Sequence, residues 1–151
     1  MRRQAPVSVG TLVRMSPSQR DEVFRSSPTG DVPRGKGDGV ALLPFGPVLT
    51  KVAAALIWAL VWKGKVFDPR YDGLRNRMTP FGARLIRAKV DKGPSWVDGE
   101  ECIVLDYART SLVAHWVRDE IREVARRTYL GQVFVRGRKL LHFTLTFPPP
   151  A

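Results

Sequence analysis

Three dipeptides that favour tight turns divide the chain into short segments after residue 70. Asp72-Gly73 and Asp98-Gly99 are of the type that closes two-residue β-hairpins, and Arg136-Gly137 separates two strand-like runs. The 151 residues include 12 prolines and 13 glycines, an enrichment that is typical of proteins with many turns. This pattern predicts a fold of short antiparallel strands.

Alternation of apolar and polar side chains identifies the strands themselves. The clearest is 139–147, where we expect apolar side chains such as Phe143 and Phe147 to face the core, and polar ones such as His142 and Thr144 to face away. Further strands are expected over 40–43, 63–68, 73–78, 84–90, 100–107 and 129–135.

The stretch from Ser111 to Arg127 fits two patterns. Alternation predicts a strand over 112–117, whereas Val117, Ile121 and Val124 stand at helical spacing. For 118–125 the sequence alone therefore leaves helix and strand open.

One helix is expected near the end of the first third of the chain. Residues 48–62 follow Pro47, which suits a first helical turn, and are rich in Ala and Leu. The apolar run Val52–Trp62 is 11 residues long, whereas a membrane span needs about 20. We expect this helix to pack on the rest of the fold.

The first 20 residues are polar and basic, without clear periodicity, and are predicted to form a flexible arm before a single domain over 21–151. Residues 26–39 hold two prolines and four glycines, which predicts an irregular loop. The N-terminus lacks the apolar region of a signal peptide, and Cys102 has no second cysteine to pair with. A cytoplasmic protein is the expectation.

About eight short strands with one helix predict a mostly β fold, either an antiparallel barrel or a sandwich. A barrel of about eight strands has an interior that either fills with side chains or holds one small ligand. The strand count alone therefore allows for a binding function.

Four segments point to a specific barrel. Residues 62–68 (Trp-Lys-Gly-Lys-Val-Phe-Asp), 102–107, 117–124 and 129–131 together resemble the layout of GXWXG-type domains. The resemblance covers roughly residues 22–147 and implies a calycin-like (lipocalin-like) barrel, with a strand over 117–125. It implies no catalytic residues, since the family has none assigned.

Motifs for catalysis and cofactor binding are missing from the sequence. The two histidines, His115 and His142, and the one cysteine do not stand at metal-ligand spacing. No nucleophile elbow surrounds Ser111, and the glycines at 35–39 do not fit a phosphate-binding loop. We expect no metal and no cofactor, and whether the protein is an enzyme stays open.

One pair of charged residues suggests a binding site. Asp106 and Tyr107 end the most apolar run, and a partly buried carboxylate there needs a partner such as Arg118. The pair has two interpretations: a polar anchor beside a ligand, or an ion pair that holds two strands together. Trp96 beside a turn fits a pocket rim or the core, and Lys65 fits an anionic head group or a solvated edge. The candidate ligand-binding residues are Trp62, Lys65, Trp96, Asp106, Tyr107, Arg118 and Tyr129.

The first functional hypothesis is that a small hydrophobic or amphipathic molecule with a polar or acidic end binds in the barrel, with isomerase or cyclase chemistry as an extension. The alternative is a basic module that binds nucleic acid or an anionic membrane surface, because the formal net charge is +11. The sequence lacks nucleic-acid recognition motifs, which speaks against that partner. Peripheral membrane contact and self-association stay open.

Overall fold

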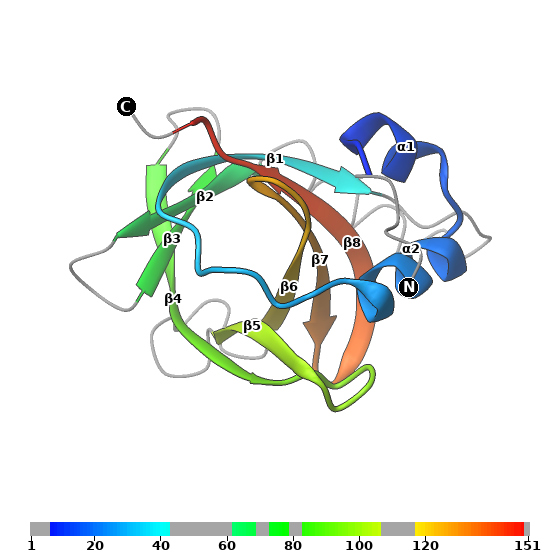
Figure 1. The fold of residues 1–151 in the computed structure, drawn as a ribbon. Coiled ribbons are helices and arrows are strands. Elements are labelled where there is room, and N and C mark those ends of the chain that lie inside the picture. Colours follow the sequence, from blue (N-terminus) through cyan, green and yellow to red (C-terminus); the bar gives the residue numbers. More distant parts are fainter. Residues whose placement is uncertain (1–6, 43–61, 69–72, 79–82, 107–116, 150–151) are drawn as a thin grey trace, which may run out of the picture.

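The fold is an antiparallel β-sheet of eight strands, each paired with the next along the chain, and the last strand pairs with the first to close a barrel (Figure 1). The computed structural model describes residues 7–42, 62–68, 73–78, 83–106 and 117–149. The strands are β1 (Gly35–Leu42), β2 (Trp62–Asp68), β3 (Gly73–Met78), β4 (Ala83–Pro94), β5 (Glu101–Asp106), β6 (Val117–Ala125), β7 (Thr128–Val135) and β8 (Arg138–Thr146).

The prediction of a mostly antiparallel β-fold is confirmed. Arg136-Gly137 joins β7 to β8 with φ +51° and +80°, the left-handed conformation that a type I′ hairpin turn requires. Asp98-Gly99 lies in the turn between β4 and β5, where Gly99 has φ +73°. Asp72 lies outside the described residues, but Gly73 begins β3 as expected.

The ambiguous stretch 118–125 is a strand, β6. Its apparent helical spacing arises because both of its faces carry buried side chains, so the simple apolar–polar alternation of a half-exposed strand is lost. Residues 43–61, with most of the expected helix, and residues 112–116 lie outside the described part. Trp62 of that expected helix is instead the first residue of β2.

The prediction of a flexible arm over 1–20 is wrong for the residues described there. They form α1 (Val9–Arg14) and the start of α2 (Pro17–Ser26). Ser16 and Gln19 make a capping box at the start of α2, a pattern that the sequence itself contains. Leu12 and Arg20 are buried, and Arg20 donates to the Leu12 carbonyl at the end of α1, so this segment is folded.

The predicted loop over 26–39 is also wrong in its last part, because Gly35–Gly39 belong to β1. Gly37 faces the Phe147 ring, and a Cβ there would lie 2.5 Å from Phe147 Cζ. Glycine therefore permits a close approach of backbone and ring inside the barrel, rather than marking a turn.

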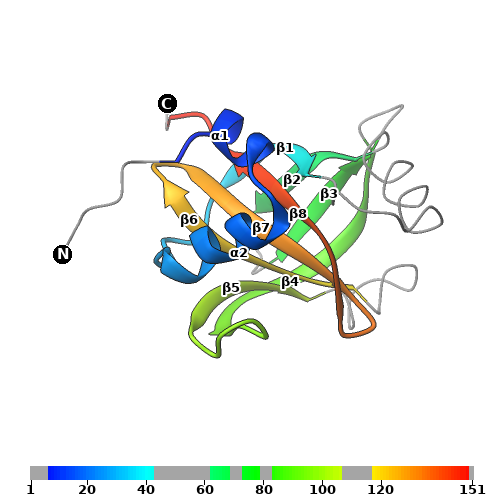
Figure 2. The ribbon, with the colours of Figure 1, turned by 90° about the vertical axis from the view of Figure 1, so that its right-hand side faces the viewer.

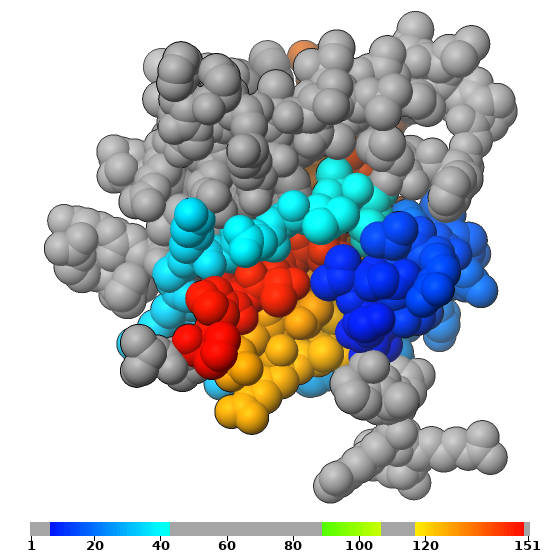
Figure 3. Space-filling model, turned by 90° about the horizontal axis from the view of Figure 1, so that it is seen from above, coloured from blue at the N-terminus to red at the C-terminus, as the bar shows by residue number. Residues whose placement is uncertain are grey.

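Two apolar clusters lie on opposite faces of the sheet. The inner cluster lines the described part of the barrel and includes Phe143 and Phe147, whose predicted burial is confirmed. The outer cluster joins Leu12 and Phe24 of the helices to the barrel wall. Figures 2 and 3 show the helices in blue outside the barrel, beside the strands. No helix in the described residues is long and apolar enough to span a membrane.

The helices also bury side chains on the outer face of β8. His142 and Thr144 point away from the barrel interior as expected, yet they are 3% and 0% exposed. The sequence predicted their direction but not their burial, because the covering helices come from the other end of the chain.

The barrel has two distinct ends. Residues 27–34, called the strap here, run from α2 to β1 across one end (Figure 1). The strap is held there by Glu123, whose N–H donates to the Thr29 carbonyl, and by Tyr129, whose hydroxyl donates to the Asp31 carbonyl. At the other end, called the Asp106 end, β5 finishes and β6 begins.

Candidate functional site

Strand β6 places charged side chains on both faces of the barrel wall. Ile121 belongs to the inner cluster, so Asp119, two residues before it, also faces inward. Arg118, Glu120 and Arg122 alternate with them and face outward. Because this strand carries charges on both faces, its position relative to the core decides which of them lies inside.

Asp119 is a buried carboxylate on an apolar inner wall. It is 2% exposed, and its cross-strand neighbours are Leu105 on β5 and Val133 on β7. The same-face neighbours along β6, Val117 and Ile121, are also apolar. Among the described buried residues of the inner face, Asp119 is the charged one. A carboxylate on an apolar wall is the kind of polar group that orients a ligand, and it marks Asp119 as a functional candidate.

At the strap end, Tyr129 forms part of the barrel floor. Its ring packs edge-on against Phe147 with 5.7 Å between centroids, and its hydroxyl is bound to the strap. Burial and a hydrogen bond with Glu123 raise the pKa of Tyr129, so the phenol stays protonated. Tyr129 was predicted to bind ligand, and it does face the interior, at the end that the strap covers.

On the outer face, Glu120 organises the turn between β4 and β5. Its carboxylate is 0% exposed and accepts hydrogen bonds from the Ser95 hydroxyl at 2.6 Å and the Trp96 N–H at 2.8 Å. Arg118 donates to the same carboxylate through Nε and Nη2, and to the Pro94 carbonyl. This network fixes the turn on the barrel wall.

Arg118 was predicted to anchor a ligand inside the barrel, and the structure places it on the outer face instead. Its guanidinium lies 4.3 Å from the Trp96 ring centroid, and Trp96 also packs edge-on against Phe134. Asp106 pairs directly with Arg118 across β5 and β6, which puts it on the same outer face. Asp106 and Arg118, which were expected to pair, are therefore neighbours in the sheet, but both lie on its outer face.

The remaining predicted residues are described only in part. The backbones of Trp62 and Lys65 lie in β2, where Lys65 pairs with Gly37 and Asn76. Their side chains and the whole of Tyr107 lie outside the described part. Trp96 lies in the turn after β4 and is 56% exposed, so it is on the outer surface and not at the rim of the interior.

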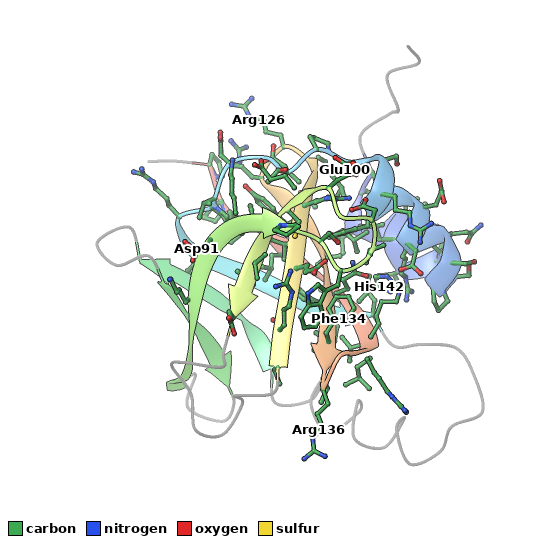
Figure 4. All side chains as sticks on the ribbon, turned by 90° about the horizontal axis from the view of Figure 1, so that it is seen from below. Asp91, Glu100, Arg126, Phe134, Arg136 and His142 are labelled. Atoms are coloured by element: carbon green, nitrogen blue, oxygen red, sulfur yellow. The ribbon has the colours of Figure 1, made fainter. Side chains whose placement is uncertain are left out.

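Two further outer contacts hold α2 to the barrel. Asp21 accepts hydrogen bonds from Lys139 and pairs with His142 Nε2 at 2.8 Å, on the side of the barrel where the helices lie (Figure 4). Burial by itself raises the pKa of Asp21. The hydrogen bonds and charges of Lys139 and His142 together outweigh this effect, so the pKa of Asp21 lies below its usual value. Arg122 forms a bidentate pair with Asp98 and also donates to the Phe24 carbonyl.

Between these contacts lies an unusual buried amide. Gln132 is 0% exposed and stands between Glu120 and His142 across three strands. Within the described part of the chain, neither its Oε1 nor its Nε2 has a hydrogen-bond partner. The outer wall under α2 therefore carries an unsatisfied polar group, which is a cost to stability.

The side chains that the structure describes hold no cluster of three or more His, Cys, Asp or Glu suited to a metal ion. Cys102 is buried on the outer wall, and burial raises its pKa to about 12. A thiol with such a pKa stays protonated and unreactive, which gives it a packing role.

No protein-family model and no curated protein matches this chain. Among solved structures it is similar to one titled "Crystal structure of protein from Thermomonospora curvata". The two share 20% identity and a TM-score of 0.64, over 89% of this chain and 88% of that one. At this identity the likeness shows a shared fold, and it carries no function with it.

Proposed function

We propose that this protein binds one small, largely apolar molecule inside the barrel. The observation that carries the proposal is the described part of the inner face, which is apolar around the buried carboxylate of Asp119. Ligand sites in proteins combine this kind of apolar lining with a few polar groups that orient the ligand. Isomerase or cyclase chemistry stays a prediction, and the proposal concerns binding.

The architecture supports the same proposal. Eight antiparallel strands in sequential order are the arrangement of lipocalin barrels, which enclose small ligands. On this ground we also propose the distant relationship to calycin-like GXWXG-type domains that segments such as 62–68 and 129–131 suggested. The strap covers one end of the barrel and would retain a molecule bound inside.

The test is native mass spectrometry of the freshly purified protein, followed by titration with a fluorescent apolar probe. Val117→Trp places a bulky ring on the inner face at the Asp106 end, where Val117 begins β6 and packs on the inner cluster. We expect this change to reduce probe binding at least about tenfold, which is the effect of about 1.4 kcal/mol.

The matched control is Val40→Trp, because Val40 is 44% exposed on β1. It adds the same ring to the outside of the barrel and is expected to leave probe binding unchanged. Equal binding by both variants, or a wild-type protein that binds neither a co-purified molecule nor the probe, contradicts a ligand inside the barrel.

A second candidate function is docking to an anionic membrane surface. Trp96 is 56% exposed and stacked on Arg118, and aromatic rings beside cations suit the membrane interface. Sedimentation with vesicles of phosphatidylglycerol tests this candidate, with vesicles of phosphatidylcholine as the control. Trp96→Ala is expected to weaken binding to the anionic vesicles, and equal binding to both vesicle types counts against the candidate.

A further inference from the structure

We propose that the strap, residues 27–34, is a gate that opens locally and lets the ligand enter and leave the barrel. The inference rests on the proposed function, since the gate serves a molecule bound inside. It adds a moving part to the fold, and it assigns to Thr29 and Tyr129 the role of holding that part closed.

The strap is tied to three neighbouring strands through two of its residues. The Thr29 carbonyl accepts a hydrogen bond from the Glu123 N–H of β6, and the Thr29 hydroxyl donates to the Glu101 carbonyl of β5 at 2.9 Å. The Asp31 carbonyl accepts a hydrogen bond from the Tyr129 hydroxyl of β7 at 2.5 Å. These bonds keep the strap across the end of the barrel where β5 begins and β6 finishes (Figure 1).

Both ends of the strap are fixed to the rest of the fold. On one side, the Phe24 carbonyl of α2 accepts a hydrogen bond from the buried Arg122. On the other side, β1 is paired with β2 from Gly35 onward. An opening of the strap is therefore local, because the residues between these two points can move outward while α2 and the sheet keep their contacts.

The strap itself buries few side chains. Pro33 is buried, whereas Asp31 and Val32 are exposed. Gly30 has φ +73° and Gly35 has φ +80°, and glycine can change φ without hindrance from a side chain, as a hinge requires. Segments with exposed side chains and few hydrogen bonds open at a lower free energy than the strands of a closed barrel.

Tyr129 links the strap to the barrel interior. Its ring belongs to the inner cluster and packs edge-on against Phe147, while its hydroxyl reaches the strap. A molecule that passes this end has to break the hydrogen bond between Tyr129 and Asp31. We therefore expect the ties of the strap to control the rates of binding and release.

The first experiment measures hydrogen exchange in the intact protein without ligand. The reporter is the Glu123 amide, because its hydrogen bond to the Thr29 carbonyl breaks when the strap lifts. In the wild type we expect this amide to exchange at least about tenfold faster than the amides at the centre of β7. In Thr29→Val, which loses one hydrogen bond of the strap, it is expected to exchange about fivefold faster still.

The second experiment measures the association and dissociation rates of the fluorescent apolar probe by stopped flow. Thr29→Val is expected to raise both rates about fivefold and to leave the dissociation constant unchanged, because a gate affects entry and release equally. Tyr129→Phe keeps the ring and removes the other tie, so both rates are expected to rise as well. The matched control is Thr128→Val, since the Thr128 hydroxyl lies at the same end but donates to the Arg126 carbonyl of its own turn. It is expected to change neither rate.

The outcomes separate the gate from the proposed function. A wild-type Glu123 amide that exchanges as slowly as the centre of β7 overturns the gate, and this result needs neither a variant nor a ligand. Probe rates that Thr29→Val and Tyr129→Phe leave at wild-type values, in variants that melt like the wild type, also overturn it and leave a barrel that binds ligands. A rise in the dissociation rate alone overturns it too, because the substituted side chain then holds the probe directly. A wild-type protein that does not bind the probe overturns the proposed function, whereas the exchange of the Glu123 amide still decides whether the strap opens.

Discussion

Arg122 connects three parts of the fold, and its removal is expected to destabilise the protein more than any surface change. The side chain is 1% exposed and donates two hydrogen bonds to Asp98, at 2.7 and 2.8 Å. It also donates to the carbonyls of Phe24, Glu100 and Glu101. One guanidinium thus joins α2 and the turn between β4 and β5 to the barrel wall.

The magnitude follows from what Arg122→Met leaves behind. Methionine keeps an apolar stem of similar length, but it supplies no donor and removes the guanidinium that lies 4.5 Å from the Phe24 ring centroid. Asp98 is 17% exposed and regains water on one side, so its cost is only partial. Loss of one partner from a buried pair typically costs about 3–5 kcal/mol, and we expect a value in that range.

Urea denaturation measures this loss. With a slope of about 2 kcal/mol per M, the transition midpoint of Arg122→Met is expected to fall by about 1.5–2.5 M at unchanged slope. The control is Arg126→Met, an exposed residue of the turn between β6 and β7, which should stay within about 0.5 kcal/mol of wild type. Arg122→Lys keeps the charge but not the planar fork, and should lose most of the same stability.

Hydrogen exchange locates the effect. Amides of α2 are expected to exchange faster in Arg122→Met than in wild type, because the Phe24 carbonyl loses the donor that fixes the helix. A midpoint equal to that of Arg126→Met would refute the reasoning, since the buried network would then contribute nothing beyond a surface charge.

Three further predictions concern other buried groups. Burial lowers the pKa of His142 against the opposing effect of its acidic partner, so the unfolded chain takes up a proton first as the pH falls through about 6.5. Stability should be complete above that pH and decrease below it, by at most about 1.4 kcal/mol per pH unit, and His142→Gln should flatten this dependence in urea titrations. Gly131→Ala would place a Cβ 2.3 Å from Phe143 Cζ and should cost about 1–3 kcal/mol, whereas Gly93→Ala, with its nearest contact at 3.6 Å, should be near neutral in the same melts. Gln132→Leu removes a buried amide without partners in the described part of the chain, and a melting temperature equal to or above wild type is expected, with a large decrease as the contrary result.

Much of the fold was predictable because it depends on patterns among residues that are close together in the sequence. The Arg136-Gly137 turn adopts the left-handed conformations that its hairpin needs, and β8 (Arg138–Thr146) matches the expected strand 139–147 to within a residue. The capping box of Ser16 and Gln19 is equally local, and its spacing in the sequence is sufficient to indicate the start of α2. Turn chemistry and alternation depend on neighbours in sequence, so they survive without knowledge of the fold.

The candidate site was less predictable because its residues alternate on one strand. Arg118, Asp119 and Glu120 are consecutive, and a shift of one residue exchanges the inner and outer sets completely. The sequence favoured Arg118 as the inward group because it pairs naturally with Asp106, and that pairing does occur in the register of the sheet. The sequence alone does not show how β6 is positioned relative to the core.

The sequence by itself determined that this chain forms short antiparallel strands, since turn dipeptides and side-chain alternation act over a few residues. Only the tertiary structure decided which charge of β6 faces the interior. That choice depends on distant partners: Leu105 and Val133 pack on the inner side, while α2 and the turn around Ser95 cover the outer side. When both faces of a strand are buried, the strand's own residues do not show which face lies inside the barrel. The packing of the whole barrel decides it.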